Sequence, residues 1–240
     1  MEETVSTNAV AKELALQGAE SGTVVMAKRQ TGGKGRMGRR FESAEGGLYL
    51  SYILRPHCHA RELMHLTCAA AVATCRAVEN VCSMRPGIKW TNDLVVGDKK
   101  IAGILTELQL ESDGGVAFAI IGIGINCLQK SEDFPENLRH IAASLSMLTG
   151  EDILPRDVAA QLIRALDETD LSRKEEIMDR YRRRCITVGR EISLVRGNEI
   201  LHAKAVDIDP EGALIIQLSD GAKQAVTSGE VSIRGMYGYV

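Results

Sequence analysis

The pattern of apolar and polar residues changes period along the chain, and the change divides it into two parts. Up to residue 186, segments with apolar residues three and four positions apart alternate with short apolar runs, which predicts helices combined with a sheet. From residue 187 to residue 240, five short alternating segments are separated by turns, which is typical of a small SH3-like β-barrel. The sequence therefore predicts an α/β fold, more strictly α+β, with one domain at 1–186 and a second at 187–240.

The same periods assign the individual helices and strands. Ser6, Thr7 and Asn8 are good N-cap residues for a helix that ends near Gly18. The other expected helices span 60–81, 156–167 and 173–184. The expected strands span 23–27, 48–54, 94–96, 100–108 and 116–126 in the first part, and 191–195, 200–206, 213–218, 224–226 and 231–234 in the second. The run 116–126 is almost entirely apolar, which is typical of a strand in the middle of a sheet.

A cationic loop, KRQTGGKGRMGRR, occupies residues 28–40 between the first two strands. It contains four glycines and six cationic side chains without one carboxylate. Glycines free the backbone and like charges repel one another, so we expect the loop to become ordered around an anion. Its GGKG lacks the spacing of a P-loop, and the GIGI of 122–125 lacks that of a dinucleotide fingerprint. A basic surface turn or a nucleic-acid contact remains the alternative.

Composition narrows the class of ligand and the compartment. The formal net charge is -3, so the cationic loop is a local exception, which favours a small anionic ligand over a polyanion. The six cysteines form no C-x-x-C pair, and Cys68, Cys75 and Cys82 recur every seven residues in an alanine-rich segment, which predicts a buried helix stripe. The chain has no apolar window of ~20 residues and no basic, hydrophobic leader. We therefore predict a cytoplasmic protein with reduced cysteines.

Six motifs follow one another in a specific order: TGGKGRMGR, LYLS, KWTNDL, KKIAGIL, GIGIN and SGEVSIR. In this order the chain resembles the biotin protein ligases over nearly its whole length, from Ser6 to Arg234. The resemblance implies a central mixed sheet with helices on one side, akin to the class II synthetases, followed by the SH3-like domain. It also implies an enzyme, a biotin–[biotin carboxyl-carrier protein] ligase, that joins biotin to ATP as biotinyl-5'-AMP. The biotinyl group would then pass to one lysine of a carrier domain of a biotin-dependent carboxylase.

The resemblance also implies roles for individual residues. Lys100, Arg36 and Asp93 would be catalytic, with Asp93 orienting or deprotonating the acceptor lysine. The biotin-binding set would be Ser6, Thr7, Gln30, Gly33, Lys34, Arg36, Lys100 and Gly103. The nucleotide-binding set would be Arg36, Arg39, Phe41, Asn126 and Arg234, with the ring of Phe41 stacked on adenine. Magnesium would arrive with ATP, and no residue is expected to be a permanent metal ligand.

The chain departs from the family pattern at three positions. Lys34 replaces an arginine, Thr91 replaces the proline of K-W-P-N-D, and Val5 replaces an acidic residue. Only five residues precede Ser6, so we expect a monofunctional ligase that has no DNA-binding domain and binds no DNA. Three alternatives stay open: a lipoate or octanoate ligase of the same fold, a non-catalytic nucleic-acid adaptor, and edge-to-edge dimerisation of the sheet.

Overall fold

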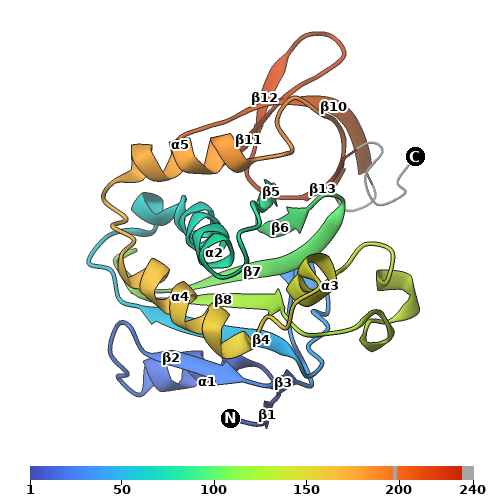
Figure 1. The fold of residues 1–240 in the computed structure, drawn as a ribbon. Coiled ribbons are helices and arrows are strands. Elements are labelled where there is room, and N and C mark those ends of the chain that lie inside the picture. Colours follow the sequence, from blue (N-terminus) through green and yellow to red (C-terminus); the bar gives the residue numbers. More distant parts are fainter. Residues whose placement is uncertain (197–198, 234–240) are drawn as a thin grey trace.

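The computed structural model describes residues 1–196 and 199–233, which form two antiparallel sheets, with helices packed on the larger one, and a short two-stranded pair (Figure 1). The larger sheet has the order β2-β4-β8-β7-β6-β5. Its strands are β2 (Val24–Ala27), β4 (Gly47–Leu54), β5 (Gly87–Lys89), β6 (Asp93–Val96), β7 (Lys99–Leu110) and β8 (Val116–Asn126). The long apolar strand β8 lies inside the sheet, as predicted from its composition.

The α+β class is confirmed, but the larger sheet differs from the expected mixed sheet. All five of its pairings are antiparallel. Strands β6, β7 and β8 are joined in sequence by tight turns at Gly97 and Gly114, whose φ angles are 61° and 86°, and such turns connect only antiparallel strands. Parallel pairing in the described ranges is confined to β1 (Glu3–Thr4) with β3 (Arg29–Gln30) and to isolated bridges.

Helices lie on both faces of this sheet, not on one as expected. Helix α1 (Thr7–Leu16) packs on one face, where its Ala11 and Ala15 contact a cluster that includes Ile53 and Ile120. The main core on the opposite face includes Ile121 and residues of α2 (Leu66–Cys82) and α4 (Pro155–Asp167). Successive residues of a strand point to opposite faces, so β8 supplies both cores.

The helix expected at 60–81 is interrupted. Residues Ala60–Leu63 form a 3-10 turn that begins with His59 donating its backbone N–H to Glu62, and α2 starts only at Leu66. The ring of His65, which is buried at the N-cap position, contacts the carbonyl oxygen of Leu171. All six cysteines are free, and two of the predicted stripe, Cys68 and Cys75, are fully buried.

The smaller sheet has the order β12-β11-β10-β9-β13, which gives the predicted five strands. They are β9 (Glu191–Arg196), β10 (Glu199–Ile208), β11 (Leu214–Gln217), β12 (Lys223–Val226) and β13 (Glu230–Ile233). The turn expected at 197–198 lies outside the described residues. No helix in the described part of the chain is long and apolar enough to cross a membrane.

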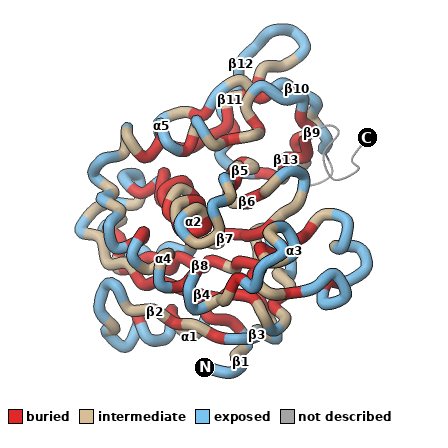
Figure 2. Tube along the Cα trace, viewed as in Figure 1, coloured by how far each residue is buried: buried red, intermediate tan, exposed pale blue. Residues whose placement is uncertain are grey.

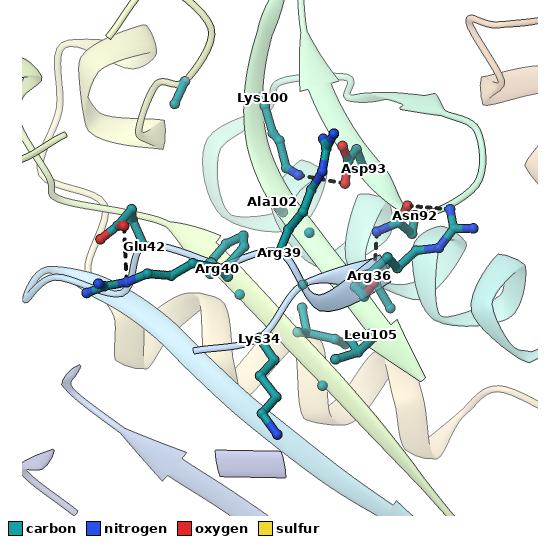
Figure 3. A pocket seen from close by; sticks show the side chains of 18 of the residues that line it. Lys34, Arg36, Arg39, Arg40, Glu42, Asn92, Asp93, Lys100, Ala102 and Leu105 are labelled. Atoms are coloured by element: carbon teal, nitrogen blue, oxygen red, sulfur yellow. Dashed lines mark hydrogen bonds and ion pairs between the residues drawn. The ribbon is translucent and has the colours of Figure 1, made fainter. Parts of the chain in front are cut away.

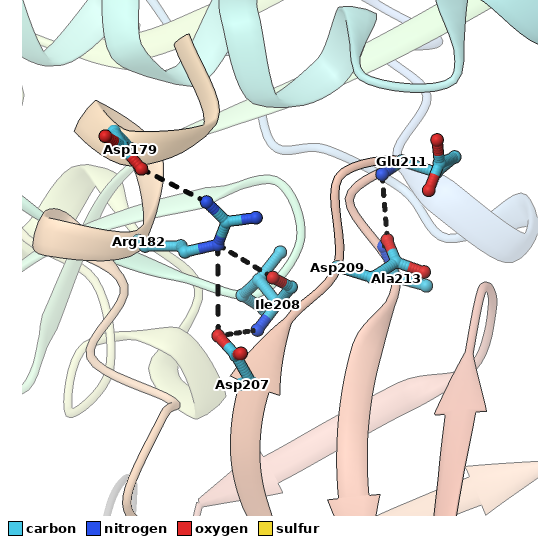
Figure 4. Close-up of polar contacts among 7 residues, drawn as sticks. All are labelled: Asp179, Arg182, Asp207, Ile208, Asp209, Glu211 and Ala213. Carbon is cyan, nitrogen blue, oxygen red and sulfur yellow. Dashed lines mark hydrogen bonds and ion pairs between the residues drawn. The ribbon is translucent and has the colours of Figure 1, made fainter. Parts of the chain in front are cut away.

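The two sheets are joined through a buried junction (Figure 2). The indole of Trp90 donates to the carbonyl of Gly212 at 2.9 Å, and the Trp90 backbone donates to Thr187. Arg182, on α5 (Lys174–Arg184), donates to the carbonyl of Ile208 at 2.8 Å and lies 3.8 Å from Asp207 (Figure 4). The boundary near residue 186 stays a prediction, because one core continues across it.

Candidate active site

A pocket of about 310 Å³ (Figure 3) lies on the same face of the larger sheet as α1, because Gly122, Gly124 and Asn126 line it and share a face of β8 with Ile120. Its walls come from the start of α1, the cationic loop, the β6–β7 hairpin, the segment 134–142 and the loop before β13. We call residues 34–42, which contain the end of the cationic loop and the two residues after it, the flap. A cavity of this size, lined by both apolar and polar groups, is typical of a small-molecule site.

The floor of the pocket is made by glycines because the flap lies directly on the sheet. Gly122 and Gly124 of β8 share one face by alternation, and Gly103 is paired with Gly124 in the neighbouring strand. A Cβ atom at position 124 would stand 2.4 Å from the Phe41 ring, and one at position 103 would stand 3.0 Å from it. The GIGIN and KKIAGIL motifs therefore supply both the buried isoleucines and the floor.

Buried hydrogen bonds hold the polar end of the pocket. Thr7 donates from its backbone N and its Oγ1 to Gln30 Oε1, at 2.8 and 3.0 Å, and Gln30 Nε2 donates to Ser43 Oγ at 2.9 Å. Ser6 occupies the N-cap position of α1, but its side chain makes no capping hydrogen bond. The capping interpretation of residues 6–8 is therefore wrong for the side chains, because Thr7 and Asn8 lie within the helix and bond toward the sheet.

The opposite end contains a lysine–aspartate pair. Lys100 Nζ lies 2.7 Å from Asp93 Oδ1, and both side chains are less than one-third exposed. The Lys100 backbone bonds to the segment at Ile141 and Ala143, at 2.7 and 3.0 Å. Asn126 Nδ2 donates to the carbonyl of Ala143 at 3.1 Å, so it fixes this wall of the pocket.

Arg36 extends from the flap to Asn92, the residue before Asp93. Its Nη1 donates to Asn92 Oδ1 at 3.1 Å, and its guanidinium carbon lies 5.9 Å from the centre of the Trp90 ring. Burial lowers the pKa of Arg36, and the negative charge of Asp93 opposes that shift. The guanidinium is thus partly desolvated, and an anion that entered the pocket would be strongly attracted to it.

The outer part of the flap is a narrow hairpin held by ion pairs. Phe41 N donates to Gly33 O at 2.9 Å and Gly35 N donates to Arg39 O at 2.7 Å. Arg39 pairs with Glu230 of β13, and Arg40 lies 3.2 Å from Glu42. Lys34 points away from Lys100 and Asp93 (Figure 3). Protein carboxylates therefore supply some of the negative charge that the loop was expected to meet.

The charges around the pocket favour an anion. Six cationic side chains line it against three carboxylates, in a chain of net charge -3: Lys34, Arg36, Arg39, Arg40, Lys89 and Lys100 against Glu42, Asp93 and Glu230. Burial lowers the pKa of Lys89, and the nearby Lys100 adds to that shift while Asp93 opposes it. In the described ranges no group of three metal-ligating residues gathers, and each of the three pocket carboxylates is paired with a cation.

The structure brings together all but two of the residues proposed from the sequence. Gly33 lies behind the wall, where a Cβ atom would stand 2.6 Å from both Phe41 O and Ser43 Oγ. Arg234 lies outside the described residues. Sequence reasoning overlooked Asn8, Lys89, Asn92, Glu230 and the wall at 134–142. Lys89 and Asn92 belong to KWTNDL and Glu230 to SGEVSIR, so the motifs carried a signal, whereas the irregular 134–142 segment carried none.

A cationic flap above a glycine floor defines an enzyme site for an anionic small molecule. Residues 1–126 match the model of the biotin/lipoate A/B protein ligase family, and residues 187–234 match the biotin protein ligase C terminal domain. The chain therefore belongs to the biotin/lipoate A/B protein ligase family, on the biotin protein ligase side.

Relatives and solved structures agree with this assignment. The bifunctional ligase/repressor BirA of Bacillus spizizenii is 37% identical over 228 residues, which span 91% of this chain and 69% of that protein. The biotin–[acetyl-CoA-carboxylase] ligase of Paracoccus denitrificans is 31% identical over 97% of this chain and 98% of its own. The biotin protein ligase from Aquifex aeolicus, solved in complex with biotin and ATP, has a TM-score of 0.80 and 30% identity, covering 98% of this chain and 97% of that chain.

Proposed function

We propose that this chain activates biotin with ATP as biotinyl-5'-AMP and transfers the biotinyl group to a lysine of a biotin carboxyl carrier domain. The observation that carries the proposal is the pocket itself, in which buried neutral hydrogen bonds at one end face a cluster of cations at the other. A biotin protein ligase with this fold was solved with biotin and ATP. The second matched model, for the biotin protein ligase C terminal domain, favours biotin over lipoate as the acid.

The cations would serve the first step. A carboxylate that attacks the α-phosphate brings two anions together, so positive charge lowers both their repulsion and the energy of the transition state. Lys100 and Arg36 are placed for this work, and Arg39 lies further out on the flap. Magnesium would enter as part of the ATP substrate. Phe41 and Asn126 would lie at the nucleotide, and Ser6, Thr7, Gln30, Lys34 and Gly103 would line the biotin end.

The Lys100–Asp93 pair suggests an order of events. Before substrates bind, Asp93 holds Lys100 at 2.7 Å. When an anionic acyl phosphate draws Lys100 away, the Asp93 carboxylate is released to orient or deprotonate the acceptor amine. The amine then attacks the acyl carbon, the acyl–oxygen bond breaks, and AMP leaves.

The proposal extends to the compartment, to DNA and to the oligomeric state. Six free cysteines suit a reducing, cytoplasmic location. The flap cations line the pocket, and Arg39 and Arg40 pair with protein carboxylates, so we propose that the chain does not use them on DNA. The β2 edge of the larger sheet could pair with a second copy, and sedimentation would show whether a homodimer forms.

The transfer of biotin tests the proposed function. The protein would be incubated with ATP, magnesium, biotin and a biotin carboxyl carrier domain, and the product weighed by mass spectrometry. We expect one biotinyl group on one lysine and none on a carrier whose acceptor lysine is changed to arginine. A carrier that gains no mass, with adenylate still formed, would remove the transfer step from the proposal.

A further inference from the structure

A chain of hydrogen bonds runs from the surface of the larger sheet into the polar end of the pocket. Its outer member is Glu107, an exposed residue of β7 whose Oε2 accepts from Asn8 Nδ2 at 2.7 Å. Asn8 Oδ1 accepts from Ser51 Oγ at 2.6 Å, and Ser51 Oγ also lies 2.8 Å from Thr7 Oγ1. Asn8, Ser51 and Thr7 are all buried.

The bare backbone of β8 at Gly122 leaves room for this series of hydrogen bonds. Ser51, Gly122 and Leu105 stand side by side in register on β4, β8 and β7. A Cβ atom at position 122 would lie 2.1 Å from Asn8 Oδ1, so Asn8 rests on the bare backbone of Gly122. Glycine at this position is therefore needed for Asn8 to reach both neighbouring strands.

These contacts restrict where the protons lie, because Ser51 has one hydroxyl proton and two oxygen neighbours, Asn8 Oδ1 at 2.6 Å and Thr7 Oγ1 at 2.8 Å. An ionised carboxylate accepts hydrogen bonds and cannot donate, so Glu107 at 2.7 Å, with a longer contact to the Leu105 carbonyl at 3.5 Å, fixes the amide of Asn8 with its nitrogen outward and its oxygen toward Ser51. The single proton of Ser51 then goes to Asn8. If the amide were reversed, its nitrogen would donate to Ser51, and Ser51 would have to donate to Thr7 instead.

The Thr7 hydroxyl group connects this series of hydrogen bonds to the ligand. The proton of Thr7 Oγ1 goes to Gln30 Oε1 or to Ser51 Oγ, and the Thr7 backbone N–H donates to Gln30 Oε1, which sets the orientation of that amide. With the Ser51 proton committed to Asn8, the Thr7 oxygen keeps an acceptor site, and Thr7 lines the pocket. Such a site selects a ligand that carries an N–H donor, as the ureido ring of biotin does and as lipoate and octanoate do not.

We propose that Glu107 is a positioning residue for acid selection: through Asn8 and Ser51 it keeps the Thr7 oxygen open to an N–H of the ligand. The inference rests on the proposed function for the identity of that ligand. Glu107 itself stays outside the pocket and touches no substrate.

The test compares substitutions at Glu107 with a matched control nearby. Biotin affinity would be measured by titration calorimetry for wild type, Glu107→Ala, Glu107→Gln and Glu111→Ala, the last being an exposed carboxylate four residues along the chain. We expect Glu107→Ala to weaken biotin binding about 5- to 10-fold, the value of one hydrogen bond, with the KM for ATP and the rate at saturating biotin unchanged. Glu107→Gln keeps an acceptor and should restore binding, and Glu111→Ala should bind as wild type does.

A double substitution tests which neighbour receives the hydroxyl proton of Ser51. In Glu107→Ala/Ser51→Ala no serine proton remains to occupy Thr7, so biotin affinity should recover relative to Glu107→Ala alone. Three results would each overturn the role of Glu107: equal biotin affinity in wild type and Glu107→Ala, an equal loss toward biotin and ATP, or no recovery in either Glu107→Gln or the double substitution. A wild-type protein that binds no biotin would instead overturn the proposed function.

Discussion

The polar end of the pocket and the flap above it are held by different kinds of interaction. The polar end is formed by neutral side chains that bond to one another, among them the buried Thr7 and Ser51 and the partly buried Gln30. The flap is held at its tip by ion pairs whose arginines, Arg39 and Arg40, are 65% and 66% exposed. Buried neutral hydrogen bonds are insensitive to salt and fix geometry, whereas exposed ion pairs contribute little and are screened. The polar end is therefore suited to selecting the acid, and the ion pairs at the tip of the flap should weaken as salt is added.

We expect the largest effect at Lys100, the cation at the end of the pocket opposite Thr7 and Gln30. Lys100→Met keeps most of the apolar stem and deletes the charge, so adenylate formation should fall by at least ~10²-fold, as for removal of an electrostatic stabiliser. Biotin affinity should weaken much less. Single-turnover adenylate formation and calorimetry measure the two quantities, and equal losses in both would reduce Lys100 to a binding contact.

The next effect concerns retention of the intermediate by the flap. Arg36→Gly removes a charge-assisted hydrogen bond worth about 1.5–3 kcal/mol, so biotinyl-adenylate should escape roughly 10- to 100-fold faster. The released anhydride should label lysines of a bystander protein such as serum albumin, detected on a biotin blot. If the variant makes adenylate but labels albumin no more than wild type does, another part of the flap retains the intermediate.

A smaller effect is expected where the flap meets the glycine floor. Gly124→Ala places a Cβ atom 2.4 Å from the present position of the Phe41 ring, so the ring must move. Overpacking of this kind costs about 1–3 kcal/mol, and we expect the KM for ATP to rise about tenfold. Steady-state kinetics at saturating biotin would measure it, and an unchanged KM for ATP would argue against stacking of Phe41 on adenine.

The smallest effect belongs to the ion pair between the flap and β13. Arg39→Gln should change the KM for ATP only about two- to threefold at low salt, because an exposed pair is worth about 0.2–1 kcal/mol. Glu230→Gln tests the same pair from the other side. Both effects should shrink as salt is added, and a large, salt-independent loss would show that Arg39 contacts the substrate directly.

Local sequence patterns were enough to predict most of the fold. The hairpins at Gly97 and Gly114 and the five strands of the smaller sheet follow from turn residues and alternation, which act over short distances. The antiparallel order of the larger sheet and the placement of α1 on its second face depend on packing between segments far apart, which periodicity does not encode.

The sequence predicted the site residues that lie within the motifs. It missed the residues that come into contact only across the sheet. Asn8 reads as a cap in the sequence because asparagine is common there, but in the structure it bonds to Glu107, 99 residues further along the chain. Glu107 itself has no local signal, since exposed carboxylates are common on strands that face solvent.

The choice of acid tests the central claim most directly. Pyrophosphate release would be measured with ATP, magnesium and a panel of carboxylic acids that contains biotin, lipoate and octanoate. If the buried hydrogen bonds at Thr7 and Gln30 select a ureido ring, biotin should give release, and lipoate and octanoate should give none above background. Release with lipoate or octanoate and none with biotin would contradict the account.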